Sequence, residues 1–251
     1  MSGHSKWHSI KHKKGKEDAK RGQLFSKLSH RITIAAREGG GNPDMNATLA
    51  HEVESARSYS MPMENIKRAI AKGTGELAGG QLDHMTFEGY GEAGVAIIVD
   101  VLTDNRNRTS AEVRKAFTRA GARLGETGSV AWIFEKKGLF LIKKTPEHDE
   151  DELLTIALDA GADDLRDEGD YWEIVCDIEN FARVRDGLKA AGVETESAEL
   201  TMVPKNTIKL DSDGARKVLR LIDVLEELDD VNDVYANFDI PDEVLEEEAT
   251  L

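Results

Sequence analysis

The hydrophobic period of this chain changes at Gly73–Gly80, and that change limits what the chain can fold into. Four of these eight residues are glycine, as is typical of a linker. Before the linker, apolar residues recur at the spacing of amphipathic helices. After it, short apolar runs typical of strands alternate with helical segments. The sequence therefore predicts a helical domain followed by α/β structure.

The helical domain, residues 1–75, is expected to contain three helices with thin apolar stripes. In the first helix, Leu24, Leu28 and Ile32 form the stripe, and cationic residues lie along its flank. Three glycines end the first helix, and Pro62 separates the second from the third. The predicted helices span residues 16–37, 45–59 and 63–72.

The α/β part is expected to contain one domain inserted into another. Residues 138–205 follow the order β-α-β-β-α-β, which is the ferredoxin-like arrangement. The elements predicted in residues 206–240 have no partners of their own, so we expect them to complete a second ferredoxin-like sheet with residues 82–136. The fold class is therefore α+β and multidomain, with an acidic tail at residues 241–251.

Three local features belong to the discontinuous domain. Thr109 and Glu112 have the spacing of a capping box, which predicts a helix over residues 109–120. Residues 129–134 are predicted to be a strand, and residues 207–210 another strand of the same sheet.

Charge is distributed unevenly along the chain. The net charge is −15, yet residues 1–37 contain ten Lys or Arg and two acids, whereas residues 145–251 contain nine basic and 32 acidic residues. A basic block in an acidic protein favours a polyanionic partner over the alternative of a solubilising disordered leader. We predict nucleic-acid contacts from the following residues: Lys6, Trp7, Lys11, His12, Lys13, Lys14, Lys16, Lys20, Arg21, Lys27, Arg31, Arg106 and Arg108.

Within the basic arm, Trp7 is suited to stack on an unpaired base, while the lysines neutralise phosphates. Phosphate contacts carry no sequence information, so they do not separate DNA from RNA. His4, His8 and His12 have a helical spacing compatible with zinc. The surrounding lysines oppose a divalent cation, so we favour polar contacts to phosphate or base and predict no metal.

Arg106 and Arg108 precede the predicted helix over residues 109–120. A phosphate bound there would pair with both arginines and with the first N–H groups of the helix. The other interpretation is an ordinary surface ion pair with Asp104 or Glu112. Both interpretations remain open at this point.

Two further motifs are not favoured as binding sites. Gly89–Gly94 matches G-x-G-x-x-G, but the residues after it are predicted to form a strand, and a dinucleotide site needs a helix there. We interpret it as a hairpin turn. The helices over residues 45–72 resemble a DNA-reading pair, but Pro62 lies in the turn and the second helix is short.

Other classes of protein are excluded by what the sequence lacks. Ser, His and Asp are scattered and no phosphate loop is present, so we predict a non-enzymatic protein without cofactor or small-molecule substrate. No apolar run reaches membrane-helix length, and no secretory signal is found. The single cysteine, Cys176, excludes an intramolecular disulfide. We expect a cytoplasmic protein with no membrane partner.

Many spaced blocks of this sequence resemble the YebC/PmpR family. They are GHSKW at Gly3–Trp7, IKHKK at Ile10–Lys14, DAKRG at Asp18–Gly22, GGGNP at Gly39–Pro43, MPMENIKRAI at Met61–Ile70, KGTG at Lys72–Gly75, EGYG at Glu88–Gly91, LTDNRNRT at Leu102–Thr109 and GSVAWIFEKKG at Gly128–Gly138. His8 and Ser9 depart from the family pattern, which has alanine and asparagine there.

The resemblance implies an all-helical N-terminal domain followed by two α/β domains, one interrupting the other. It also implies a regulator of gene expression, because members are described as probable transcriptional regulators and mitochondrial relatives as translational activators. Our first hypothesis is a transcriptional regulator on duplex DNA, and the alternative is a ribosome-associated translation factor contacting ribosomal RNA. The acidic carboxyl-terminal half either limits non-specific binding or docks a basic protein partner.

Overall fold

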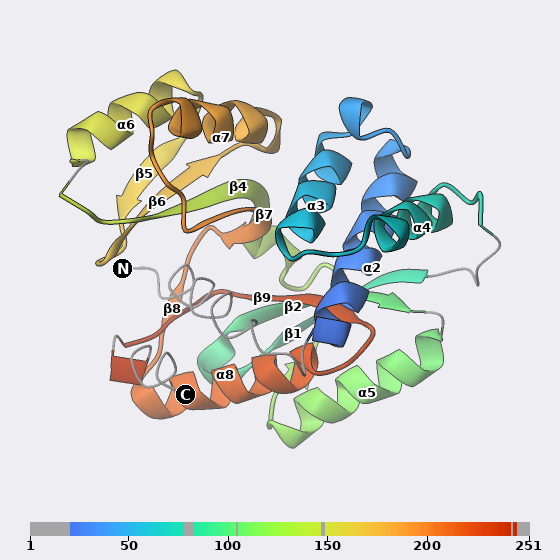
Figure 1. Ribbon diagram of the computed structural model, residues 1–251. Coiled ribbons are helices and arrows are strands. Elements are labelled where there is room, and N and C mark those ends of the chain that lie inside the picture. The colour runs from blue at the N-terminus through green and yellow to red at the C-terminus, as the bar shows by residue number, and fades with distance from the viewer. Residues whose placement is uncertain (1–20, 78–82, 104, 147–148, 242, 245–251) are drawn as a thin grey trace. The chain divides into compact units, whose positions relative to one another are not determined.

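The computed structural model describes residues 21–77, 83–103, 105–146, 149–241 and 243–244 (Figure 1). These residues form two compact units, which we describe separately. One unit lies within residues 21–131 and 216–236, and the other within residues 132–215 and 237–244. Among the described residues, no helix combines the length and the apolar composition needed to span a membrane.

The first unit begins with three α-helices packed on a small core. Leu28, Ile32, Leu49 and Ile66 are buried in this core, which confirms the apolar stripes predicted from the sequence. Asn46 joins two of the helices, since its Oδ1 accepts from Leu49 N–H at 3.0 Å and its Nδ2 donates to the Ala35 carbonyl at 2.8 Å. The elements are α2 (Arg21–Gly39), η2 (Pro43–Met45), α3 (Ala47–Ser58) and α4 (Met63–Gly73).

The same unit contains an antiparallel sheet with the strand order β3-β1-β2-β9. Helices α5 and α8 lie on one face of the sheet, and α2 approaches the opposite face at β9 (Figure 1). Gly89 permits close approach of α5, because a Cβ there would lie 2.5 Å from Cε1 of Phe117. The elements are β1 (Asp83–Tyr90), η3 (Glu92–Gly94), β2 (Ala96–Thr103), α5 (Arg106–Arg119), β3 (Arg123–Leu124), α8 (Ser212–Glu226, which runs from the second unit into this one) and β9 (Val231–Ala236).

The second unit is built on an antiparallel sheet with the strand order β5-β6-β4-β7, which is the ferredoxin-like order. Helices α6 and α7 lie side by side on one face of this sheet (Figure 1). Phe140 and Phe181 stack in the core with ring centroids 4.8 Å apart. The elements are β4 (Phe134–Lys143), α6 (Glu150–Asp159), β5 (Asp164–Asp167), β6 (Tyr171–Cys176), η5 (Ile178–Asn180), α7 (Phe181–Ala190), β7 (Ser197–Pro204), β8 (Ile208–Lys209) and β10 (Phe238–Asp239).

Three local predictions are wrong. Residues 129–134 are not a strand: a turn and the 3₁₀ helix η4 (Ala131–Ile133) precede β4. The strand expected at residues 207–210 is β8, which pairs with β10, while β3 forms the edge of the other sheet. Helix α5 begins at Arg106, because Asn105 is its N-cap. Thr109, the predicted cap, is a buried residue inside the helix, and its hydroxyl group donates to Asp230.

Candidate nucleic-acid interface

The structure places the side chains of four of the predicted contact residues, and the basic arm lies outside the described residues. Arg21 is the first residue of α2. The four whose side chains are placed are Lys27, Arg31, Arg106 and Arg108, on α2 and α5. Eight others lie outside the described residues: Lys6, Trp7, Lys11, His12, Lys13, Lys14, Lys16 and Lys20.

The cations along the flank of α2 contact the carboxyl end of α8 and strand β9, in the same unit. Lys27 Nζ donates to the Glu226 carbonyl at 2.9 Å. Arg31 Nε donates to Asp233 Oδ2 at 3.1 Å, and Arg31 Nη2 donates to the other oxygen of the same carboxylate. Asp233 is the main cause of a raised pKa for Arg31. These two cations therefore attach the helical part of the unit to α8 and β9.

A second polar cluster holds the start of α5. Asp230 Oδ2 accepts from Thr109 Oγ1 at 2.6 Å, from Arg108 Nη2 at 2.7 Å and from Thr103 Oγ1 at 3.0 Å. Burial raises the pKa of Asp230, but these hydrogen bonds outweigh burial and hold the pKa below its ordinary value. Asp230 thus fixes the junction between β2 and α5.

This cluster separates the roles of the two predicted arginines. Both lie in the first turn of α5, and Asn105 Oδ1 accepts the Arg108 N–H at 3.1 Å. Arg108 forms an ion pair, as one interpretation of the sequence proposed, and one of its partners is Asp230, a residue not considered there. Arg106 is exposed and has no ion-pair partner among the residues that the structure describes.

The helical part of the unit keeps exposed cations on its other surfaces. Lys67 and Arg68 on α4, with Arg57 on α3, are exposed. The described part of the chain offers them no ion pair or hydrogen bond through their side chains. Positive charge therefore remains available to a partner on α3 and α4.

Gly89–Gly94 forms a hairpin turn, which confirms its interpretation from the sequence. Strands β1 and β2 pair along their whole length from Asp83 with Thr103 to Tyr90 with Ala96.

Glu88 on β1 is buried, and its carboxylate accepts the N–H groups of Gly128, Val130 and Ala131 at 2.7, 2.7 and 2.8 Å. Burial raises the pKa of Glu88, but the hydrogen bonds from the three N–H groups lower it by a larger amount, so the net pKa is below its ordinary value.

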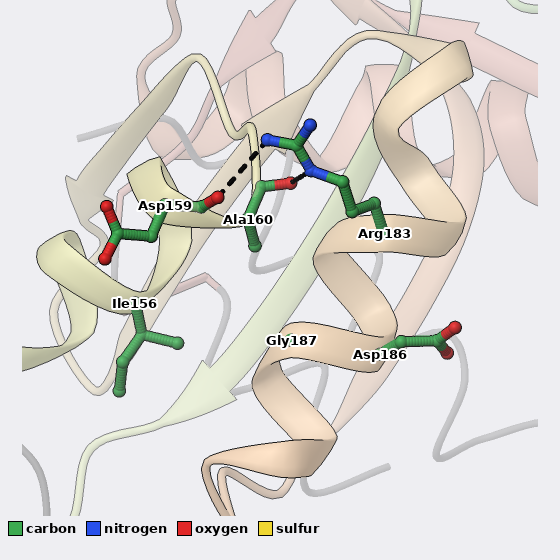
Figure 2. A pocket seen from close by; sticks show the side chains of 6 residues that line it. All are labelled: Ile156, Asp159, Ala160, Arg183, Asp186 and Gly187. Carbon is green, nitrogen blue, oxygen red and sulfur yellow. Dashed lines mark hydrogen bonds between the residues drawn. The ribbon is translucent and has the colours of Figure 1, made fainter.

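A shallow groove between α6 and α7 has a structural explanation. Figure 2 shows Arg183 reaching from α7 toward the end of α6. Its Nε donates to the Ala160 carbonyl at 2.7 Å and its Nη2 to the Asp159 carbonyl at 3.2 Å (Figure 2). The guanidinium thereby caps the carboxyl end of α6, where cations are favoured.

The anchors Asp230 and Asp233 were missed by the sequence analysis. Asp230 lies 122 positions after Arg108 in the sequence, and Asp233 lies 202 positions after Arg31. Nothing in local spacing links an aspartate in the acidic half to a basic helix near the N-terminus. Only the return of the chain to the first sheet brings them together.

Two family models match nearly the whole chain. The model described as TACO1/YebC protein N-terminal domain matches residues 5–76, and the one described as TACO1/YebC second and third domain matches residues 82–238. The crystal structure of a conserved hypothetical protein from Aquifex aeolicus aligns with a TM-score of 0.77 and 44% identity, covering 89% of this chain and 92% of that one.

Curated relatives extend over the full length. A protein of Dictyoglomus turgidum is 53% identical over 246 residues, covering 98% of this chain and 99% of the relative. A protein of Rubrobacter xylanophilus is 53% identical over 250 residues, covering 99% of this chain and 100% of the relative. Both are named probable transcriptional regulatory protein.

Proposed function

Because the chain belongs to the TACO1/YebC family, with relatives named probable transcriptional regulators, we propose that it is a non-enzymatic, nucleic-acid-binding regulator of gene expression acting in the cytoplasm. The basic N-terminal region binds the phosphate backbone of duplex DNA. The observation that carries this proposal is the charge of residues 1–37, with ten Lys or Arg against two acids in a chain of net charge −15.

The arm carries most of this proposed contact. Lys27 and Arg31 are engaged within the molecule, whereas Lys67 and Arg68 extend the exposed positive charge of the helical region. The carboxyl-terminal half, with 32 acids and nine cations in residues 145–251, repels nucleic acid and either limits non-specific binding or docks a basic protein.

Ribosomal RNA is the alternative target. Trp7 lies among the lysines of the arm, and an aromatic side chain beside cations suits unpaired bases, which are common in folded RNA. A factor of this kind would regulate translation, not transcription.

The test replaces Lys11, Lys13 and Lys14 by Ala and measures binding to a DNA duplex and to RNA between 50 and 200 mM KCl. Each lost phosphate contact should reduce the slope of log K against log salt by roughly 1. Replacing Lys136, Lys143 and Lys189 by Ala is the control, since these exposed lysines change the net charge equally. Unchanged affinity and salt dependence in the arm variant would remove the arm from the proposal.

DNA and ribosomal RNA are separated by fractionating lysate on a sucrose gradient. Salt-sensitive co-migration with ribosomal particles supports the translation factor. Specific retention of a promoter fragment over competitor DNA supports the transcriptional regulator.

A further inference from the structure

Helix α5 has one face against the sheet and one face covered with cations. Thr109, Val113, Ala116 and Phe117 are buried, and they recur at the helical period. The exposed cations on α5 beyond the Asp230 cluster are Arg106, Arg114, Lys115 and Arg119. The helix as a whole, RNRTSAEVRKAFTR, contains five basic residues and one acid.

These four cations have no ion-pair or hydrogen-bond partner for their side chains within the described part of the chain. Their isolation is informative because acids outnumber cations in this protein, 48 to 33. Eight cations elsewhere in the described chain form ion pairs: Arg31, Arg108, Lys137, Lys144, Arg166, Arg185, Lys205 and Lys217. Exposed cations without such a partner also lie on α3 and α4, but α5 carries four of them on one helix. Arg106 lies in the first turn on the side of Val113, whereas Arg114, Lys115 and Arg119 lie opposite the buried residues, so the outer face of α5 has kept its charge uncompensated.

The surface between these cations is formed by small side chains and is slightly hollowed. Ser110, Ala111 and Thr118 line a shallow groove together with Arg114, Lys115 and Arg119. The two hydroxyl groups donate inward, Ser110 Oγ to the Arg106 carbonyl at 2.6 Å and Thr118 Oγ1 to the Arg114 carbonyl at 2.8 Å. Small side chains on the helix and long cations around them allow an anionic strand to approach closely.

We infer that the outer face of α5 is a second binding surface for the phosphate backbone of nucleic acid, separate from the basic arm. The inference rests on the proposed function and extends it to the α/β part of the first unit. A helix of 14 residues is about 21 Å long, enough to lie along several successive phosphates. Its exposed face carries no aromatic residue, so it contributes affinity without reading bases.

The junction at Asp230 holds the start of the helix that carries this surface. Asp230 ties Thr109 and Arg108 to the end of β2, so the first turn of α5 is held while the cations further along remain unpaired. A fixed row of cations loses little conformational entropy of the backbone on binding.

The experiment replaces Arg114, Lys115 and Arg119 by Gln in the full-length protein. Binding to fluorescent 20-nucleotide single-stranded RNA, and to 20-base-pair RNA and DNA duplexes, is measured by anisotropy between 50 and 200 mM KCl. The control carries Lys136→Gln, Lys143→Gln and Lys189→Gln, which alter the net charge equally at exposed lysines elsewhere. We expect affinity for at least one probe to fall about tenfold or more at low salt, and the salt slope to fall by roughly 2 to 3, only in the α5 variant.

An α5 variant that binds every probe like the control overturns the inference. If the arm variant loses binding in the same assay, the proposed function survives that result. A wild-type protein that binds none of the probes removes both. Stronger competition by polyglutamate than by nucleic acid, at equal charge, also overturns the inference and assigns the face to an acidic protein.

Unfolding of the triple variant is checked by its thermal transition. Arg114→Glu alone then provides the same test, because a single exposed reversal leaves the core of α5 intact. It should weaken binding more than Lys189→Glu, and equal binding by the two overturns the inference.

Discussion

Arg31 on α2 donates hydrogen bonds to both carboxylate oxygens of Asp233 on β9, so a helix near the N-terminus is attached to the last strand of the first sheet. The side chain of Asp233 is 12% exposed and that of Arg31 32%. Two-point pairing of this kind is stronger than a single-point surface ion pair.

Replacing Arg31 by Met should lower the free energy of unfolding by about 2–3 kcal/mol, because a largely buried carboxylate loses its counter-ion. Denaturant unfolding at neutral pH measures the loss. Arg57→Met, on the exposed side of α3, should cost about 0.5 kcal/mol or less. The double variant Arg31→Met, Asp233→Asn should lose less than the sum of the two single variants. Additive losses would show that the pair does not couple these elements.

Glu88→Gln should destabilise the protein by about 2 kcal/mol at neutral pH, since an amide offers one acceptor oxygen to three N–H donors. The pKa of Glu88 is lowered in the folded state. Its stabilising contribution is therefore present above the unfolded pKa of about 4.5 and is lost as pH falls through the folded pKa. Urea unfolding from pH 7 down to pH 3 should show the two proteins converging in acid. A difference that stays constant with pH would refute this role.

Glu173 should destabilise the protein as the solution becomes neutral. It lies on β6, on the sheet face opposite α6 and α7, and burial raises its pKa to about 7 despite Arg166 Nη1 at 3.2 Å. A raised folded pKa means that stability is lost as pH rises from about 4.5 through about 7. Glu173→Gln should abolish this loss, making the variant more stable than wild type at pH 8 by at most about 3 kcal/mol. Glu194→Gln is the exposed control, and a wild-type stability that is flat over this range would contradict the assignment.

Gly89→Ala should lower the free energy of unfolding by about 1–3 kcal/mol through overpacking. The new Cβ would meet Cε1 of Phe117 at 2.5 Å and the Arg123 carbonyl oxygen at 2.7 Å. Gly91→Ala is the matched control in the same motif, where the nearest atom is the flexible end of Ile97 at 3.0 Å. Thermal unfolding compares them, and equal losses would show that helix packing is not what requires Gly89.

The layout of elements followed from the sequence because it rests on local signals. The stripe through Leu28 and Ile32, the glycines after β1 and the apolar run of β2 each determine structure within a few residues. The predicted α5 nevertheless began three residues late, because Thr109 resembled a cap while its hydroxyl group is bonded to Asp230 and Thr103.

The electrostatic partners were less accessible to sequence reasoning. Arg31 looked like a nucleic-acid contact because its neighbours in the sequence are basic, and its partner Asp233 lies 202 positions away. Conversely, Arg114, Lys115 and Arg119 have a usable signal: they lie opposite the buried Val113, Ala116 and Phe117 on the helical wheel. That amphipathic contrast is present in the sequence itself.

The order in which the chain is synthesised matters for the two aspartate anchors. Asp230 and Asp233 emerge from the ribosome after both basic helices and after the whole of the ferredoxin-like sheet. Until then, α2 and α5 have neither their carboxylate partners nor the edge strand β9. Strand β9 therefore completes the first unit, and a nascent chain that ends before Asp230 would contain both cationic helices without the aspartates that orient them.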